Sequence, residues 1–321
     1  MIILTGAAGF IGFHTAQALL AAGHSVIGID NLNSYYNPAL KRARLEKLKS
    51  HKGFTFCEAN IADAPAMEKI AAQYASATHI VHLAAQAGVR YSLENPYAYA
   101  ESNLMGQLVM LEMARHLKNL KHFVYASSSS VYGNSAKAPF GLDERCDEPV
   151  SLYAATKRSG EMLAHSYASL YKFPATGLRF FTVYGPWGRP DMAYFSFTKN
   201  IFEGKPIKVF NNGDLRRDFT YIDDIVAGIV SALDKPSPNA VPHRVFNLGN
   251  HRPVQLLDFI ATIERASNHK AIMEMSPMAA GDVYETCADI TESQNTLGFE
   301  PKTTLDKGIP AFIEWYRDYY Q

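Results

Sequence analysis

The chain has 321 residues, of which 47% are hydrophobic, so it is long enough to bury the cores of a large domain and a smaller lobe. Its 31 Lys and Arg residues balance its 31 Asp and Glu residues, and the sequence pI is about 7.2. This balance excludes a global electric field that would recruit nucleic acid or an anionic membrane. A small ligand bound at one site is therefore expected, with no nucleic-acid partner.

The first residues and the cysteines lead to two further expectations. The opening apolar run, residues 1–4, is too short for a signal peptide or a membrane span, which predicts a cytoplasmic protein with no membrane partner. Cys57, Cys146 and Cys287 are far apart and show no C-x-x-C spacing. We therefore expect reduced cysteines, no disulfide framework and no metal site.

The first half of the chain alternates short β-branched runs with longer stretches of helical periodicity. The expected strands are residues 2–5, 25–30, 54–59, 79–85, 121–127 and 175–181. The expected helices are residues 11–22, 64–74, 97–117 and 152–171, with a last helix near 305–319. This alternation predicts an α/β fold with a doubly wound parallel sheet of the Rossmann type.

The rhythm changes near residue 181 to loops rich in Gly and Pro, followed by mixed short elements. The predicted organisation is a nucleotide-binding domain over residues 1–180 and a smaller C-terminal α/β lobe that binds the substrate over residues 181–321. Some later segments are expected to return to the first domain.

A glycine-rich turn follows the first strand and precedes the first helix. In residues 5–12 (TGAAGFIG) the glycines let the backbone turn sharply and approach a pyrophosphate at the helix N-terminus. Asp30 closes the second strand, where a ribose-binding carboxylate belongs, and its charge disfavours a 2′-phosphate. We therefore predict a site for NAD rather than NADP, with contacts from Gly6, Gly9, Phe10, Ile11, Gly12, Asp30 and Asn31.

The ends of the next two strands are also candidate cofactor contacts, because parallel sheets gather ligands at the carboxyl ends of their strands. The candidates there are Asn60, Ile61, Leu83, Ala84, Ala85 and Gln86. Alternatively, these six are loop residues that contact no ligand.

Three polar side chains are the candidate catalytic residues. Tyr153 and Lys157 are four residues apart, hence on one face of a helix, and a nearby ammonium favours the phenolate. A tyrosine tuned in this way can take and return a hydroxyl proton while a hydride passes to nicotinamide. Ser128 belongs to a serine cluster upstream, whose hydroxyls can bond a reacting oxygen, although a plain polar loop is the alternative.

Together these motifs resemble the extended short-chain dehydrogenase/reductase family of nucleotide-sugar enzymes along essentially the whole chain. The stretches that carry the resemblance are residues 82–92 (HLAAQAGVRYS), 185–192 (GPWGRPDM) and 217–224 (RDFTYIDD). The resemblance is strongest to members that act on UDP-glucuronate. It implies that Ser128, Tyr153 and Lys157 are catalytic, with Lys157 also binding the nicotinamide ribose.

The same resemblance implies contacts with the nicotinamide and the substrate. Asn103 and Phe180 fall among the cofactor contacts, and Arg217 falls where the family grips the diphosphate of UDP. Thr182 and Arg189 fall where the sugar carboxylate is held. The complete set of implied substrate contacts is Arg90, Ser128, Ser129, Phe181, Thr182, Arg189, Arg217 and Asp282.

The activity implied is the NAD-dependent C4 epimerisation of a UDP-sugar through a 4-keto intermediate, first of all UDP-glucuronate to UDP-galacturonate. Ser129 and Ser130 stand where decarboxylating and dehydrating relatives carry acidic residues, so the extra acid-base groups of those reactions are lacking. A homodimer formed through residues 97–117 and 152–171 is also implied.

Three alternatives remain open. The first is a 4-epimerase for a neutral UDP-hexose or a UDP-N-acetylhexosamine, which the same chemistry would serve. The second is a catalytically silent NAD-binding protein, which should have lost Tyr153 or Lys157. The third is a simple alcohol dehydrogenase, which would release reduced cofactor.

Overall fold

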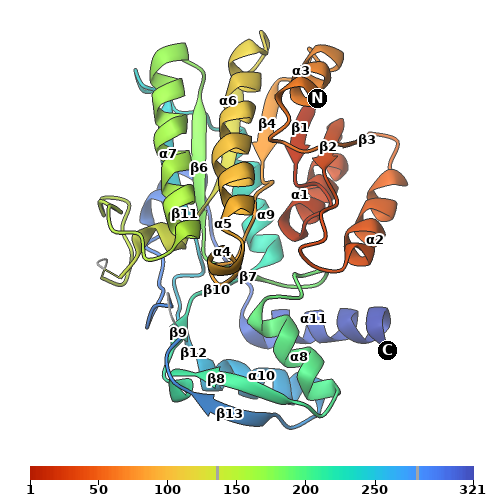
Figure 1. The fold of residues 1–321 in the computed structure, drawn as a ribbon, viewed down its shortest axis with the longest axis vertical. Helices are drawn as coiled ribbons and strands as arrows, with labels where there is room; N and C mark the ends of the chain where they lie inside the picture. Colours follow the sequence, from red (N-terminus) through yellow and green to blue (C-terminus); the bar gives the residue numbers. More distant parts are fainter. Residues whose placement is uncertain (135–136, 280–281) are drawn as a thin grey trace.

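A parallel sheet of seven strands is the centre of the computed structural model, which describes residues 1–134, 137–279 and 282–321 (Figure 1). Its spatial order is β11-β6-β5-β4-β1-β2-β3, with parallel pairing throughout. The strands are β1 (Ile2–Thr5), β2 (Val26–Asp30), β3 (Phe54–Glu58), β4 (His79–His82), β5 (His122–Ser128), β6 (Ala175–Phe180) and β11 (His243–Leu248). The predicted doubly wound α/β class is confirmed. The strand order reverses between β1 and β4, where folds of this class bind ligands.

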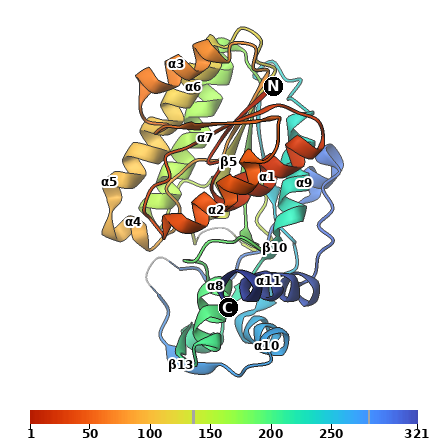
Figure 2. The same ribbon diagram turned by 90° about the vertical axis from the view of Figure 1, so that its right-hand side faces the viewer.

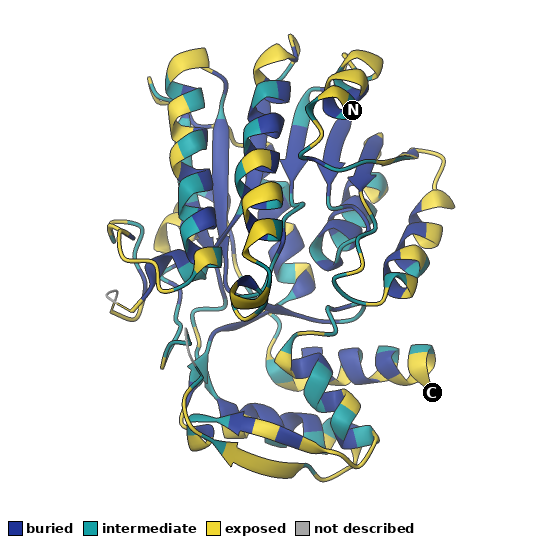
Figure 3. Cartoon of the chain, viewed as in Figure 1, coloured by how far each residue is buried: buried dark blue, intermediate teal, exposed yellow. Residues whose placement is uncertain are grey.

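Helices cover both faces of the sheet, as Figure 2 shows edge-on. One face carries α1 (Phe10–Ala21), α2 (Pro38–Lys49) and α9 (Ile222–Leu233), and the other carries α3 (Ala64–Gln73), α6 (Gly106–His116) and α7 (Leu152–Tyr171). Side chains alternate across a strand, so Ile2 and Leu4 join the first core cluster while Ile3 joins the second. Figure 3 shows the resulting buried sheet between helices with exposed outer faces.

The second lobe lies beyond the carboxyl edge of the sheet and has its own core. Its elements are β7 (Thr182–Tyr184), α8 (Ala193–Phe202), β8 (Pro206–Phe210), β9 (Arg216–Arg217), β10 (Phe219–Tyr221), β12 (Val254–Gln255), α10 (Leu256–Ser267), β13 (Ile272–Ser276) and α11 (Leu305–Tyr320). Phe219 stacks on Phe259 in this core, with ring centroids 4.2 Å apart. The chain returns to the first lobe between these elements, because β11 pairs with β6 and α9 packs on α1.

Two helical segments differ from the sequence expectations. The expected set of helices did not include α2, because charged residues dominate it, although Asn37 caps its start and Pro38 occupies its first position. The helix expected over residues 97–117 is interrupted. It is preceded by α4 (Tyr91–Glu94) and consists of α5 (Pro96–Tyr99), a π-helical turn (Ala100–Met105) and α6. The π-helical turn brings Asn103 inward, where it bonds Gln86 and Thr156.

A buried ion pair joins α7 to the two strands beneath it. Glu161 is 2% exposed and accepts two hydrogen bonds from Arg179 of β6, of 2.8 and 2.9 Å. It also accepts a 2.6 Å bond from Ser127 of β5 and a 2.9 Å bond from Arg158. Burial opposes ionisation of Glu161, but these partners outweigh it, so the net pKa of the carboxyl is lowered.

Glu161→Gln should lower the free energy of unfolding by about 3–5 kcal/mol, because it leaves the buried Arg179 charge uncompensated. The folded-state pKa of Glu161 is lowered, so this stability is present above the ordinary glutamate pKa of about 4.3 and is lost as pH falls further. Urea titrations at neutral and acidic pH measure both effects. Glu46→Gln, in the exposed Glu46–Lys49 pair, is the control and should change stability by at most about 1 kcal/mol. Equal losses for the two variants would contradict the assigned role.

Candidate active site

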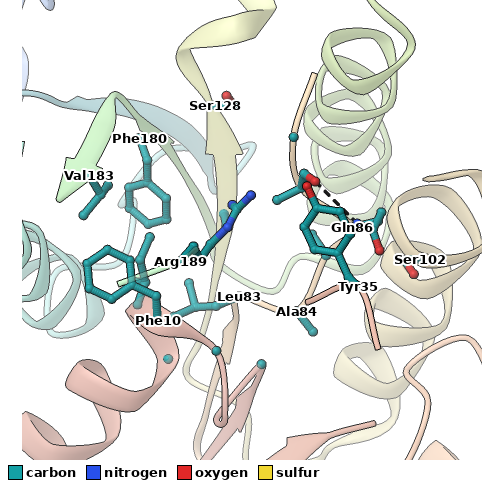
Figure 4. A pocket seen from close by; sticks show the side chains of 18 of the residues that line it. Phe10, Tyr35, Leu83, Ala84, Gln86, Ser102, Ser128, Phe180, Val183 and Arg189 are labelled. Atoms are coloured by element: carbon teal, nitrogen blue, oxygen red, sulfur yellow. Dashed lines mark hydrogen bonds between the residues drawn. The ribbon is translucent and has the colours of Figure 1, made fainter. Parts of the chain in front are cut away.

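A cavity of about 400 Å³ lies at the carboxyl ends of the sheet strands, between the two lobes (Figure 4). It contains most of the predicted site residues. The predicted residues that line it are Gly6, Gly9, Phe10, Ile11, Gly12, Asp30, Asn31, Ile61, Leu83, Ala84, Ala85, Gln86, Ser128, Ser129, Tyr153, Lys157, Phe180, Phe181, Thr182 and Arg189. One space therefore joins the expected cofactor contacts to the expected reactive residues.

The glycine-rich turn has the shape that a dinucleotide requires. Gly6 has φ +72°, and a Cβ on Gly12 would lie 2.0 Å from the carbonyl oxygen of Gly6. Within the described part of the chain, no side chain caps α1 and no acidic residue lies in its first turn. Its first N–H groups and the positive end of its dipole are therefore available to a pyrophosphate. These residues fit NAD.

The expected ribose contact, Asp30, is held by backbone donors. Its Oδ2 accepts from Ala8 N at 3.1 Å and its Oδ1 from Leu32 N at 2.9 Å. Lone pairs remain on both oxygens for ribose hydroxyls. Lys41 also lines the cavity, donating 2.7 Å to Asn33 Oδ1, and lies within electrostatic range of Asp30. The positive charge of Lys41 partly offsets the repulsion that Asp30 would exert on a 2′-phosphate, so the charge argument against NADP is weaker than the sequence indicates. The sequence did not reveal this lysine as a neighbour of Asp30 because it lies on α2, a helix that was not expected.

Tyr153 and Lys157 both line the cavity from α7, opposite Ser128 at the end of β5. Lys157 Nζ donates to the carbonyl oxygen of Ala126 at 3.0 Å. Burial lowers the pKa of Lys157 to about 8, with the charge of Glu161 opposing the shift. Burial raises the pKa of Tyr153, while Ser128 and the charge of Arg189 oppose that shift.

In the chain by itself burial has the largest effect on the Tyr153 phenol and raises its pKa, so the expected lowering effect of Lys157 stays a prediction. Desolvation dominates, so the Tyr153 phenol stays protonated, and Lys157 directs its ammonium to a backbone carbonyl. The spacing of the two residues shows that they share a helix face. It does not show the desolvation, which depends on tertiary packing.

Five predicted site residues do not line the cavity. Asn60 donates 2.7 Å to Glu101, and Asn103 supports the backbone of Gln86 from behind. The Arg90 guanidinium lies over the Phe210 ring, 4.4 Å from its centroid. The other two, Arg217 and Asp282, pair with each other, with Nη2 and Oδ1 2.6 Å apart. Ligand contacts of these five residues stay predictions.

The cavity wall also contains residues that the sequence predictions missed. Several come from the segment after β2, where short polar and aromatic residues follow Asp30. Their position at the carboxyl end of a strand was the available signal. The additional lining residues are Asn33, Tyr35, Tyr36, Lys41, Ala59, Ala87, Gly88, Val89, Ser102, Ala126, Val183 and Met192. Ser127 and Ser130 of the serine cluster also line the wall.

No group of three or more His, Cys, Asp or Glu side chains in residues 1–134, 137–279 and 282–321 could hold a metal ion. In the same residues no helix combines the length and apolar character needed to cross a membrane. Cys57, Cys146 and Cys287 are free thiols.

Gly12→Ala should reduce NAD retention by the purified protein at least about tenfold, because its methyl group collides with Gly6 in the turn. The absorbance and mass of the nucleotide released on denaturation measure retention. Gly160→Ala is the matched control. Its methyl group on α7 would meet only the Gln107 side chain of α6, at an ordinary contact distance of 3.7 Å, so NAD retention should be unchanged. Full retention by Gly12→Ala would exclude the turn as the pyrophosphate site.

Comparisons with known proteins agree with this geometry. Residues 2–249 match the model of the NAD dependent epimerase/dehydratase family. The chain is 47% identical to a probable UDP-glucuronate 4-epimerase of Rhizobium meliloti, covering 99% of this chain and 97% of the relative. It resembles the UDP-glucuronic acid 4-epimerase of Bacillus cereus, solved with UDP-glucuronic acid and NAD, with TM-score 0.92, 35% identity and 99% coverage of both chains. It also resembles the UDP-glucose 4-epimerase of Thermotoga maritima, solved with UDP-glucose, with TM-score 0.90, 31% identity and coverage of 100% and 99%.

Proposed function

The chain belongs to the NAD dependent epimerase/dehydratase family, and on this premise we propose that it epimerises UDP-glucuronate at C4 to UDP-galacturonate, with NAD as its cofactor. The observation that carries the proposal is the single cavity that joins the glycine-rich turn, Tyr153 and Arg189. Relatives from Rhizobium meliloti and Bacillus cereus that bear the name of this activity support it.

The reaction needs a base at the 4-hydroxyl, and Tyr153 supplies it. The chemistry that NAD supplies when bound is the reversible acceptance of a hydride from C4 of the sugar. In the chain by itself burial keeps the Tyr153 phenol protonated. The positive charges of Lys157 and of bound NAD would favour the phenolate, which takes the 4-hydroxyl proton and later returns it, while Ser128 bonds the same oxygen. Lys157, whose pKa is lowered to about 8, adds a nearby positive charge when protonated. Rotation of the 4-keto sugar about its link to the diphosphate presents the other face of C4.

A glucuronate substrate also needs a clamp for its carboxylate. The 4-keto intermediate is a β-keto acid. When its C5–C6 bond aligns with the ketone π system, that bond breaks, its electron pair passes to the C4 oxygen as an enolate, CO₂ leaves and C5 later takes a proton. The Arg189 guanidinium, with Thr182 and Ser129 in the same cavity, can hold the carboxylate out of this alignment.

A neutral UDP-hexose is the second candidate substrate, supported by the likeness to the Thermotoga maritima enzyme solved with UDP-glucose. The same Tyr153, Ser128 and Lys157 would serve it. The feature that favours glucuronate is the guanidinium of Arg189 within the cavity, because a carboxylate at its remaining donors would accept charge-assisted hydrogen bonds that a neutral hydroxymethyl group cannot match.

Incubation of the purified protein with UDP-glucuronate should produce UDP-galacturonate, separated by chromatography, without bulk NADH accumulation. UDP-glucose should turn over much more slowly under the same conditions. Tyr153→Phe is the control and should lower the rate by about 10²–10⁴, because it removes the acid-base group but keeps the ring. Preferred turnover of UDP-glucose would establish the neutral-hexose alternative, and no turnover of either sugar would refute the proposed function.

Arg189→Ala should slow epimerisation and raise the proportion of UDP-pentose in the product, because the carboxylate is free to rotate. Removal of a charge-assisted contact predicts a rate loss of about tenfold to a hundredfold. Arg145→Ala, at a guanidinium that is exposed beside Asp147, is the matched control and should behave as the unaltered chain. Slow epimerisation with no decarboxylated product at all would count against the clamp.

We infer that the chain forms a homodimer through the outer faces of α6 and α7, and this stays a prediction. The two helices pack side by side, as Figure 1 shows. Large apolar side chains are exposed on α7 and on the helical turns that lead into α6, which is typical of an interaction surface. These residues are Leu93, Tyr97, Met105, Met162 and Leu170. The cytoplasmic location also stays a prediction.

A further inference from the structure

The Arg189 guanidinium already has a carboxylate partner within the chain. Its Nε donates to Asp191 Oδ1 at 3.1 Å and its Nη2 donates to Asp191 Oδ2 at 2.5 Å. The two side chains are only 22% and 28% exposed. A two-point bond of this kind fixes the plane of the guanidinium as well as its position. These two bonds use Nε and Nη2, and the guanidinium carbon lies 6.0 Å from the centroid of the Tyr35 ring, so the Nη1 edge is the one offered to a ligand.

Tyr35 is the third member of this group. Its hydroxyl donates to Asp191 Oδ2 at 3.1 Å, and its ring lies 4.8 Å from that of Tyr91. The pKa of the Tyr35 phenol is raised to about 12, by burial first and then by the charge of Asp191, so the hydroxyl stays protonated and donates. Burial opposes ionisation of Asp191, but Arg189 outweighs it and the net pKa of Asp191 is lowered. The group is thus a guanidinium, a carboxylate and a neutral phenol.

Tyr35 belongs to the cofactor half of the cavity, in the segment that follows Asp30, whereas Arg189 and Asp191 follow β7. There is little free space around the contact. A Cβ on Gly88 would lie 2.7 Å from the Tyr35 hydroxyl. In Figure 4 the Arg189 guanidinium reaches toward the centre of the cavity, with Phe180 on one side and Tyr35 on the other. Its charge and that of Asp191 both act on the reacting phenol of Tyr153.

We propose that Asp191 and Tyr35 are positioning residues that set the orientation of Arg189 toward the substrate carboxylate, and so determine how much of the β-keto intermediate loses CO₂. The inference rests on the proposed function. Asp191 holds the Nε and Nη2 edge, Tyr35 holds Asp191, and the carboxylate binds at Nη1. A guanidinium that can turn also lets the carboxylate turn into the alignment that breaks the C5–C6 bond.

The first test measures the ratio of UDP-pentose to UDP-galacturonate formed from UDP-glucuronate. Tyr35→Phe removes one hydroxyl and should raise this ratio by a factor of roughly three to ten, the equivalent of one hydrogen bond. Asp191→Asn should raise it further. A general loss of structure would lower both products together and leave the ratio unchanged. Tyr91→Phe is the matched control, because it keeps the ring beside Tyr35 and removes only a hydroxyl that bonds Asn95.

The double variant Tyr35→Phe/Asp191→Asn separates a shared action from two independent ones. If Tyr35 acts only through Asp191, the double variant should have the product ratio of Asp191→Asn alone. If the increases in product ratio caused by the two single variants multiply in the double variant, Tyr35 does not act through Asp191 and the proposed order of contacts is contradicted. If Asp191→Asn does not fold, the single hydroxyl change in Tyr35→Phe still decides the matter, with circular dichroism and bound NAD as checks of its integrity.

A binding measurement keeps this inference separate from the proposed function. In a Tyr153→Phe background the substrates bind with little turnover, so calorimetry can measure their Kd values. The Kd of UDP-glucose divided by the Kd of UDP-glucuronate then measures the preference for the acidic sugar. Adding Tyr35→Phe should lower this quotient by a factor of roughly three to ten, because only the acidic ligand uses Arg189. An unchanged quotient or an unchanged product ratio would overturn the positioning role. If the unaltered chain makes no UDP-galacturonate, the proposed function fails, and the quotient still decides whether the group positions Arg189 for a carboxylate.

Discussion

The ion pair between Glu161 and Arg179 is the interaction on which the site depends. It joins the helix that carries Tyr153 and Lys157 to β6, and the Ser127 hydroxyl extends it to β5. Glu161 lies one helical turn after Lys157, and its charge partly offsets the burial that lowers the pKa of the lysine. A single buried carboxylate therefore positions the catalytic helix and helps to keep its lysine protonated.

A second buried charge connects the two halves of the cavity. The Arg44 guanidinium is fully buried and uses all five N–H groups. They donate to the carbonyl oxygens of Ala8, Trp187 and Gly188 and to the Tyr36 hydroxyl. It thereby ties the glycine-rich turn to the loop that precedes Arg189. Arg44 and Tyr35 both follow β2, so the cofactor half of the chain contributes to the placement of the substrate half.

The helix positions and the glycine-rich turn could be predicted because their signals are local. Apolar periodicity, capping residues and glycine spacing act over one or two turns of chain, and residues 5–12 carry both a strand end and a helix start. Helix α2 was missed because its buried Leu40, Leu45 and Leu48 are separated by charged residues, which hide its apolar face. The π-helical turn around Asn103 was missed because it depends on bonds to Gln86 and Thr156, which are distant in sequence.

The sequence by itself determined the chemistry that is present: a glycine-rich turn, an acidic strand end, a tyrosine and a lysine on one helix face, and arginines in motifs of a known family. Tertiary structure alone decided how those groups behave. It raised the pKa of Tyr153 through burial, directed Lys157 to the Ala126 carbonyl, and placed Asp191 and Tyr35 against Arg189. The physical reason is that desolvation and charge pairing depend on which distant segments meet, whereas helix faces and turns depend on neighbours in the chain.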